Sequence, residues 1–507
     1  MRLALVAVVA VPFVAAYADQ ASHANHAKRL QHARQAPPAS PSGSGSTTAA
    51  GASAAHSAGT STTPGAPPVT GATTTAVPTA APPNTVSVSV SLLATNPTAV
   101  PLASINANAP SAATQPLAST PTAGAVPTSI PSAPGLPNIA ALSPANYPAL
   151  DKLPPTDSPE VQQWIQDVQN SGIKIPDFAP TVAGGCPSNP GPMQDGRCWW
   201  TCGGCTRDTD IVECPDPKHW GLTYDDGPAF YTTELLDYLD EKQLKSTFFV
   251  VGSRCISFPA ILQSEYIAGH QIAVHTWSHP SLTTLTNEQI IAELGWTKKI
   301  IKDVLGVTPN MMRPPFGDID DRVRAISTAM GLTPVMWTRI SPMATFDTDD
   351  FNIHSGTTTV GQVLQNWQGI MNNVSSRDTG FIVLEHDLFQ QTVEVATGYI
   401  LPDALARGLT IEPVSTCLKR PLADAYIETN DNKTNPPPSG TGANAVPGAS
   451  PTTNTGGTGA GSNSSSASGG SGNKGSGAIE TLRFGAGGAI VAATSLVAVF
   501  AGLFTIF

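Results

Sequence analysis

Short apolar runs alternate with amphipathic stretches between Cys186 and Tyr426. The apolar runs predict strands at 221–223, 246–251, 272–274, 335–337 and 381–384. Apolar residues at helical spacing predict helices at 232–242 and 288–305, and Thr286 or Asn287 is available to cap the second. This alternation predicts an α/β domain, a distorted (β/α) barrel or a parallel sheet, with polar residues presented at the strand ends.

A further helix is predicted at 158–169, just before this domain. Its apolar residues lie at helical spacing, and Asp157 or Ser158 is available as a cap; they are Val161, Trp164, Ile165 and Val168. We expect this helix to pack on the α/β domain.

The chain on either side of the middle region has the composition of disordered segments. Gly (45), Pro (47) and only 12% charged residues indicate long stretches that bury too little apolar surface to offset chain entropy. Residues 35–137 are rich in Ala, Pro, Ser, Thr and Gly, which predicts a disordered, O-glycosylated stalk. The alternation at 86–93 is expected to stay unstructured, and 439–477 is expected to be a flexible linker.

The first residues have the pattern of a secretory signal peptide, 1–18. Arg2 supplies the positive start, residues 3–16 the apolar stretch, and Ala16 to Ala18 the small-residue cleavage pattern.

The last residues have the pattern of a GPI-attachment signal. An apolar run at 489–507 follows a less apolar spacer, and small residues at 475–478 offer an attachment site. Ser476 is the first choice and Asn473 the second. A tail-anchored transmembrane helix is the alternative, because the run is nearly long enough to span a bilayer.

Charge and cysteine content restrict the class of partner and the compartment. A net charge of −11 and a pI near 5.3, with scattered Lys and Arg, argue against nucleic acid as a partner. All seven cysteines lie in the middle region, so disulfides are expected in a secreted chain, with one thiol left over. The CGGC motif at 202–205 is also compatible with a redox or metal site. Glycosylation sequons begin at Asn373, Asn432 and Asn463.

Two pairs of polar residues follow predicted strands and are candidates for chemistry. Asp225 and Asp226 stand side by side in TYDDGP, where adjacent carboxylates suit metal binding or acid/base work. Neighbours on an extended chain point in opposite directions, so the two are expected to have different roles. His275 and His279 stand four apart in HTWSHP, a spacing that lets two imidazoles reach one metal ion.

Three later motifs complete a recognisable order: RPPFG (313–317), DTDDF (347–351) and LEHD (384–387). Over roughly 214–425 the chain resembles the NodB-type polysaccharide deacetylases, carbohydrate esterase family 4, and within it the fungal chitin deacetylases. Tyr224, Phe316 and Phe351 stand where members more often have Phe, Tyr and Trp.

The resemblance implies a metal site and an acid/base pair. Asp226, His275 and His279 would hold a divalent metal, zinc in most members, with cobalt or another transition metal as alternatives. Asp225 would be the general base, paired with Arg313, which tunes its pKa.

The same resemblance assigns the remaining site residues. His386 would be the general acid, oriented by Asp350. The backbone N–H of Phe316 would assist the oxyanion, and Leu384 would line the pocket for the acetyl methyl group. In members of the family, a cysteine before the first motif often pairs with one near the end of the domain, which here implies a Cys214–Cys417 bridge.

The implied activity is hydrolysis of N-acetyl groups of N-acetylglucosamine units in chitin, which gives chitosan and acetate in the cell wall. The alternatives are a non-catalytic wall mannoprotein that binds polysaccharide, and a deacetylase of another glycan. We expect a monomer on the outer face of the cell membrane. The predicted segments are a signal peptide (1–18), a disordered region (19–157), a Cys-containing extension (158–213), the deacetylase domain (214–427), a linker (428–476) and a GPI propeptide (477–507).

Overall fold

The computed structural model describes residues 90–341 and 344–430. The predicted signal peptide, the predicted linker beyond residue 430, the GPI propeptide with Ser476, and the sequons at Asn432 and Asn463 lie outside these ranges. Within them, no helix is both long enough and apolar enough to cross a bilayer.

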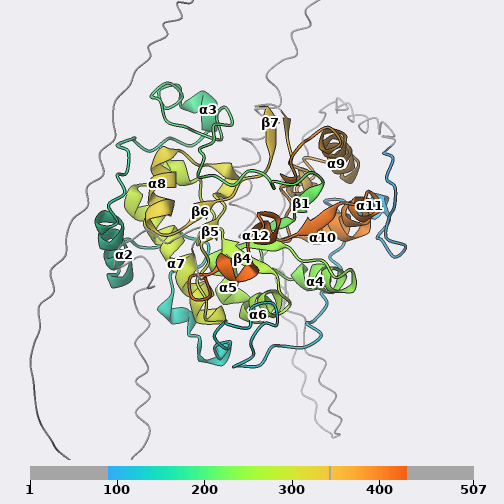
Figure 1. Cartoon of the computed structure of the whole chain (residues 1–507), viewed down its shortest axis with the longest axis horizontal. Coiled ribbons are helices and arrows are strands. Elements are labelled where there is room, and N and C mark those ends of the chain that lie inside the picture. Colours follow the sequence, from blue (N-terminus) through green and yellow to red (C-terminus); the bar gives the residue numbers. More distant parts are fainter. Residues whose placement is uncertain (1–89, 342–343, 431–507) are drawn as a thin grey trace, which may run out of the picture. The chain divides into compact units, whose positions relative to one another are not determined.

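Parallel strands form the centre of the domain (Figure 1). One sheet has the order β2-β3-β4-β5-β6, with strands Thr223–Asp225, Thr247–Val250, Gln271–Val274, Met311–Met312 and Thr333–Pro334. A second has the order β10-β1-β9, with strands Thr410–Glu412, His219–Gly221 and Phe381–Ile382. A separate antiparallel pair joins β7 (Arg339–Ser341) to β8 (Ala344–Thr345).

The two parallel sheets join into one ring. Only Leu222 separates β1 from β2, so the two strands are halves of one extended segment. The amide of Thr338, just after β6, donates to the carbonyl oxygen of Ile382 in β9 over 3.0 Å. A parallel bridge between Asp225 and His386 continues the pairing of β1 with β9 toward the carboxyl ends of the strands. The predicted α/β architecture is therefore confirmed as an irregular parallel barrel.

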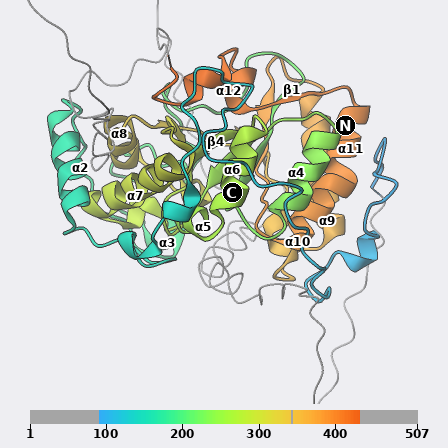
Figure 2. The same ribbon diagram turned by 90° about the horizontal axis from the view of Figure 1, so that it is seen from below.

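Helices surround the strands (Figures 1 and 2). In both views α2, α7 and α8 lie on one side of the strands and α4, α9, α10 and α11 on the other. The helices are α2 (Pro159–Asn170), α3 (Gly185–Ser188), α4 (Thr232–Glu241), α5 (Gly252–Ser257), α6 (Pro259–Ile267), α7 (Asn287–Leu305), α8 (Asp321–Ala329), α9 (Val360–Val374), α10 (Gln390–Val395), the π-helix η7 (Ala396–Ile400), α11 (Leu401–Ala406) and α12 (Val414–Cys417). Short 3₁₀ turns are η1 (Leu102–Ser104), η2 (Ile139–Ala141), η3 (Pro144–Asn146), η4 (Leu282–Thr284), η5 (Pro315–Gly317), η6 (Asp350–Ile353) and η8 (Leu422–Ala425).

Local sequence accounts for the two helix starts that were predicted. The Thr286 hydroxyl accepts from the amide of Gln289, and the Gln289 side chain accepts from the amide of Thr286, which forms a capping box for α7. The Ser158 hydroxyl accepts from the amide of Val161 at the start of α2. The Trp164 ring of α2 lies directly against Gly295 of α7, where an added Cβ would come within 2.2 Å of the ring. The predicted packing of α2 on the domain is confirmed.

The strand predicted at 335–337 is displaced by two residues. Regular pairing in β6 covers Thr333–Pro334, and Val335 makes only an isolated bridge, to Ile211. The amide of Met336 donates to the carbonyl oxygen of Ile211, so the Cys-containing extension takes up the hydrogen bonds at this point. Apolar content predicted the buried segment but not where its pairing partner changes.

The expectation that residues 90–157 have no fixed fold is wrong. This segment, which we call the belt, runs along the outside of the domain, and Ile105, Ile130 and Leu136 are each at most 2% exposed. Near its start, the amide of Asn96 donates to the carbonyl oxygen of Gly398 over 2.8 Å. The apolar residues of the belt are widely spaced, and each packs at its own site on the surface of the domain. The many prolines reduce the conformational entropy that the belt loses when it becomes ordered.

The cysteines form three bridges, as expected for an oxidising compartment. Cys214 pairs with Cys417, which confirms the bridge that the family resemblance implied. The other bridges are Cys186–Cys202 and Cys198–Cys205, so the two cysteines of CGGC do not pair with each other. Cys255 is the remaining thiol and is buried. The sequon residue Asn373 lies in the last turn of α9 and is partly exposed.

Candidate metal and acid/base site

One carboxylate and two imidazoles converge at the carboxyl ends of β2 and β4. Asp226 follows β2, and His275 and His279 lie in the loop that follows β4. The Nε2 atoms of His275 and His279 lie 3.3 Å and 3.1 Å from Oδ1 of Asp226. The two Nε2 atoms are 3.2 Å apart. All three side chains are buried, and they form the group of potential metal ligands found in the described part of the chain.

The spacing of these three atoms fits a small divalent cation. Tetrahedral zinc with ligand atoms at about 2.0–2.1 Å places its ligand atoms about 3.3–3.4 Å apart. The Nδ1 atom of His275 lies 2.8 Å from the carbonyl oxygen of Arg313. A carbonyl oxygen only accepts, so Nδ1 carries the proton and the Nε2 lone pair faces Asp226. The donor set and its orientation therefore suit a metal ion.

Asp225 lies beside this cluster with its carboxylate held by an arginine. The Arg313 Nη1 atom donates to Oδ1 of Asp225 over 2.8 Å and to the Thr223 hydroxyl over 2.9 Å. The other carboxylate oxygen, Oδ2, lies 3.8 Å from Nε2 of His275. Burial lowers the pKa of Arg313, while the charge and hydrogen bond of Asp225 act against that shift. The pair therefore leaves one carboxylate oxygen directed toward the cluster.

Four residues after β9, His386 is held by Asp350. The Nδ1 atom of His386 lies 2.7 Å from Oδ1 of Asp350, and the His386 amide donates to Oδ2 over 2.9 Å. Burial acts to lower the pKa of His386. The charge and hydrogen bond of Asp350, with Asp226 and Asp225 nearby, outweigh it and raise the pKa to about 10. The imidazole is thus kept as a proton donor well above neutral pH.

Aromatic and apolar side chains border the polar groups. The Phe316 ring lies edge-on to the His279 ring, with centroids 4.6 Å apart, and Phe351 lies edge-on to His386 at 5.1 Å. Phe316 has a left-handed backbone, with φ at 59°. Leu384 is buried at 9% exposure, two residues before His386. The structure therefore brings all nine predicted residues of the catalytic, metal and substrate-binding sets into one neighbourhood of the barrel.

Asp387, to which the sequence analysis assigned no role, supports the turn at Asp226. Asp226 has φ at 80°, and a Cβ on Gly227 would lie 2.3 Å from Oδ2 of Asp387. The Thr232 hydroxyl donates to that oxygen over 2.6 Å. Burial, followed by the charges of Asp226 and Asp225, raises the pKa of Asp387 to about 7. The sequence signal that could have identified Asp387 was its position directly after His386.

A second unpredicted residue, Glu293 of α7, supports the histidine loop. Its carboxylate accepts from the amides of Trp277 and Ser278 over 2.7 Å and 2.8 Å, and from the Ser278 hydroxyl. Burial raises the pKa of Glu293 to about 7, and these hydrogen bonds oppose the shift. A helical glutamate is ordinarily a solvent-exposed residue, so no sequence signal distinguished it.

Comparison with known proteins gives consistent matches. The polysaccharide deacetylase family model matches residues 212–335. Chitin deacetylase 1 of Cryptococcus neoformans is 54% identical over 338 residues, covering 66% of this chain and 71% of that protein. Chitin deacetylase of Amylomyces rouxii is 40% identical over 247 residues, covering 46% of this chain and 56% of that protein.

A solved structure is also similar. The chitin deacetylase of Colletotrichum lindemuthianum matches with a TM-score of 0.38 and 26% identity, over 43% of this chain and 94% of that chain.

Proposed function

Because the chain belongs to the polysaccharide deacetylase family, we propose that it hydrolyses N-acetyl groups of N-acetylglucosamine units in chitin, leaving chitosan and acetate. The observation that carries this proposal is the convergence of the Asp226, His275 and His279 cluster with Asp225 and with His386, which forms a parallel bridge to Asp225. Relatives named as chitin deacetylases support chitin as the substrate.

We propose zinc as the resident ion, held by Asp226, His275 and His279. A divalent ion at this point supplies Lewis-acid polarisation of the acetamide oxygen and lowers the pKa of a bound water. Asp225 takes up the proton that the attacking water loses, through the Oδ2 atom that faces the cluster. Arg313 keeps Asp225 in place through its contact with Oδ1.

His386 delivers the second proton of the reaction. Attack by water on the acetamide carbon forms a C–O bond, and the C–N bond breaks to give acetate and a free amine. An amine leaves readily only when its nitrogen is protonated, and protonated His386 supplies that proton. Asp350 orients the ring and stabilises its charged form through Nδ1. The Phe316 amide and the Leu384 side chain are proposed to contact the carbonyl oxygen and the acetyl methyl group.

Acetate release from N-acetylglucosamine oligomers and glycol chitin tests the proposal. Purified protein should release acetate, lose this activity with a chelator and regain it with added zinc. Asp225→Asn should abolish turnover, whereas Asp216→Asn should not, because Asp216 pairs with Lys419 at the surface.

Two outcomes of this assay would contradict the proposal. Chitin binding without acetate release would indicate a non-catalytic wall protein. Acetate release from acetylated xylan but not from chitin oligomers would indicate a different glycan as the substrate.

We also propose that the protein is secreted and held at the outer face of the cell membrane by a GPI anchor at Ser476. The three disulfides support an oxidising compartment. The anchor rests on the sequence of 477–507 alone. Treatment of intact cells with phosphatidylinositol-specific phospholipase C should release the protein, and retention on the membrane would contradict the anchor.

A further inference from the structure

The carboxylate of Asp318 connects three segments of the chain. Its Oδ1 atom accepts from the indole nitrogen of Trp199 over 2.8 Å and from the Thr201 hydroxyl over 2.9 Å. Its Oδ2 atom accepts from the Thr283 amide over 3.0 Å and from the Thr283 hydroxyl over 2.7 Å. The residue is 4% exposed. Four donors from two other segments therefore meet at one buried carboxylate.

In this arrangement the Asp318 carboxylate acts as an acceptor at all four contacts. A carboxylate offers about four lone-pair positions and no donor, which matches four incoming hydrogen atoms. The Thr283 hydroxyl has one hydrogen, which it gives to Asp318. The contact of 2.7 Å between the hydroxyls of Thr181 and Thr283 is consequently donated by Thr181. The chain of hydrogen bonds then has a single direction, from Thr181 through Thr283 to Asp318.

The segments that meet at Asp318 are parts of the proposed active site or adjoin it. Thr283 lies in η4, four residues after His279. Asp318 itself follows Phe316 and Gly317, which both have left-handed backbones, with φ at 59° and 65°. This short loop has only two backbone hydrogen bonds of its own, from Gly317 and Asp318 to the prolines just before Phe316. Its conformation therefore depends on contacts from outside.

Trp199 and Thr201 belong to the cystine segment, which we define as residues 181–207. The bridges Cys186–Cys202 and Cys198–Cys205 close it. The Trp200 ring covers Gly317 so closely that an added Cβ would lie 2.4 Å from it. The cystine segment therefore packs closely against the loop that carries Phe316.

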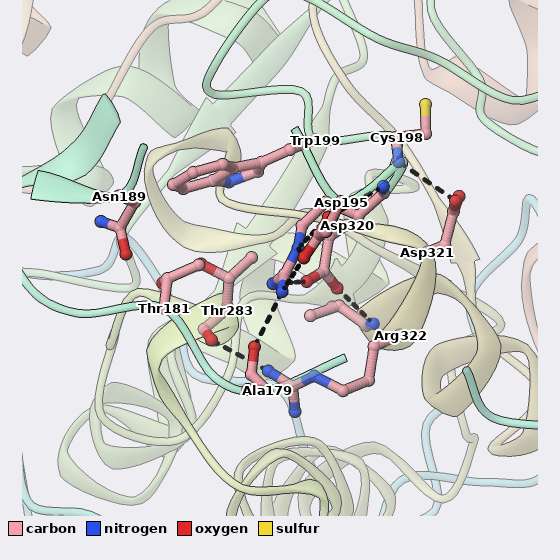
Figure 3. A network of polar contacts seen from close by, with 12 residues as sticks. Ala179, Thr181, Asn189, Asp195, Cys198, Trp199, Thr283, Asp320, Asp321 and Arg322 are labelled. Atoms are coloured by element: carbon pink, nitrogen blue, oxygen red, sulfur yellow. Dashed lines mark hydrogen bonds and ion pairs between the residues drawn. The ribbon is translucent and has the colours of Figure 1, made fainter. Parts of the chain in front are cut away.

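Ionic contacts attach the cystine segment to the start of α8. Arg197 pairs with buried Asp320 over 3.0 Å, and the Cys198 amide donates to Asp321 over 3.1 Å. Figure 3 shows Asp195, Cys198 and Trp199 on the cystine side of this network. Asp320 and Asp321, at the start of α8, lie beside them in the same view. These contacts hold the cystine segment against the start of α8.

We propose that Asp318 is a positioning residue for the deacetylation proposed above. It fixes the backbone of Phe316 relative to His279 by connecting the loop after Met312, the turn after His279 and the cystine segment. It acts through Phe316 and contacts no reacting atom. This inference rests on the proposed function, because its effect on rate requires that the Phe316 amide faces the acetamide oxygen.

Asp318→Asn is the sharpest test, because the two side chains have the same shape. The side-chain NH₂ group of Asn can take the place of either carboxylate oxygen. At both positions it faces two of the four donors and cannot accept a hydrogen bond from them. We expect kcat to fall between about 10-fold and 100-fold, as for displacement of a catalytic group by about 1 Å. KM and the zinc dissociation constant should change less than about twofold, because Asp318 itself contacts no metal ligand and the Phe316 amide is expected to act mainly on the oxyanion that develops in the transition state. Asp195→Asn is the matched control: it alters a carboxylate of the cystine segment that contacts Arg197 and not the Phe316 loop.

Two results would overturn the proposal. An unchanged kcat would show that Asp318 does not position the loop. A parallel loss of kcat, zinc affinity and melting temperature would show a purely structural role. If Asp318→Asn does not fold, Trp199→Phe decides, since it removes the indole N–H that donates to Asp318 and keeps an aromatic side chain at this position; kcat equal to that of the unmodified chain would then overturn the proposal.

Hydrogen–deuterium exchange separates this inference from the proposed function. It is measured on the zinc-loaded protein without substrate. Asp318→Asn should exchange faster at 313–320 and 280–284, with protection elsewhere unchanged, and equal protection would overturn the proposal whatever the substrate is. Absence of acetate release by the unmodified chain would instead refute the deacetylase function.

Discussion

The indole nitrogen of Trp277 donates a hydrogen bond to the carbonyl oxygen of Ala149 over 3.1 Å. Trp277 lies between the two histidines of the metal cluster, and Ala149 lies in the belt. The Tyr147 ring stacks on the Trp277 ring, with centroids 6.2 Å apart and planes 6° apart. The belt therefore contacts the metal-binding loop from the outside of the barrel.

Tyr147→Ala should loosen the belt. Loss of the ring contacts should lower the free energy of unfolding by about 2 kcal/mol, measured by urea denaturation. Limited proteolysis should cut the variant within 138–158 faster than the unmodified chain. Tyr147→Phe is the control: it keeps the ring and removes only the hydroxyl bond to Asp303, so a loss of about 1 kcal/mol is expected. Rapid cleavage of the belt in the unmodified chain under native conditions would contradict the structure.

His279→Ala should remove a metal ligand. Zinc affinity, measured by equilibrium dialysis with metal analysis, should fall at least about 100-fold, since even removal of a group that supports a ligand costs 10–100-fold. Acetate release should fall with it. His219→Gln is the control, because His219 pairs with Glu412 at the start of β1, away from the cluster. Unchanged zinc content in His279→Ala would refute this ligand set.

The raised pKa of His386, about 10 against an ordinary 6.5, predicts a pH dependence. The folded state binds this proton more tightly than the unfolded chain. Its contribution to stability is therefore complete below about pH 6.5 and is lost as pH rises toward 10. Asp350→Asn removes the main stabilising charge, so its stability deficit should be largest near pH 6 and shrink by pH 10.

The same variant should change the pH–rate profile. The alkaline limb of kcat reports loss of the general-acid proton, so Asp350→Asn should move it down by at least about one pH unit. Asp347→Asn is the matched control from the same loop, since Asp347 accepts from the Asp349 amide rather than from His386. If the alkaline limbs of the kcat profiles of Asp350→Asn and the unmodified chain superimpose, His386 is not the general acid.

The Cys214–Cys417 bridge should contribute more to stability than the Cys198–Cys205 bridge. They span 203 and 7 residues, and the loop-entropy model gives about 5 and about 2 kcal/mol for loops of these lengths. Double Cys→Ala variants, compared by guanidinium denaturation, test the order. A larger loss for the shorter loop would show that native contacts, not loop closure, determine the contribution.

The site residues could be predicted from sequence because the order of their motifs resembles that of a known family, and the strands explain why these residues meet. Parallel strands place their carboxyl ends at one edge, so Asp226 after β2 and His275 after β4 had to lie near each other. Asp318 and Glu293 were not predicted, because their roles depend on contacts with other segments. Their partners, Trp199 and Ser278, lie on other segments, and nothing local in the sequence indicates such contacts.

Local sequence specifies the α/β alternation, the start of α7 at its Thr286 cap and the types of residue at the site. Those features depend on local periodicity, capping and side-chain chemistry, which short stretches carry alone. Only the tertiary structure decided that residues 90–157 are ordered and that Cys202 and Cys205 pair with Cys186 and Cys198. Both depend on surfaces and distances between segments that exist only after the barrel has formed.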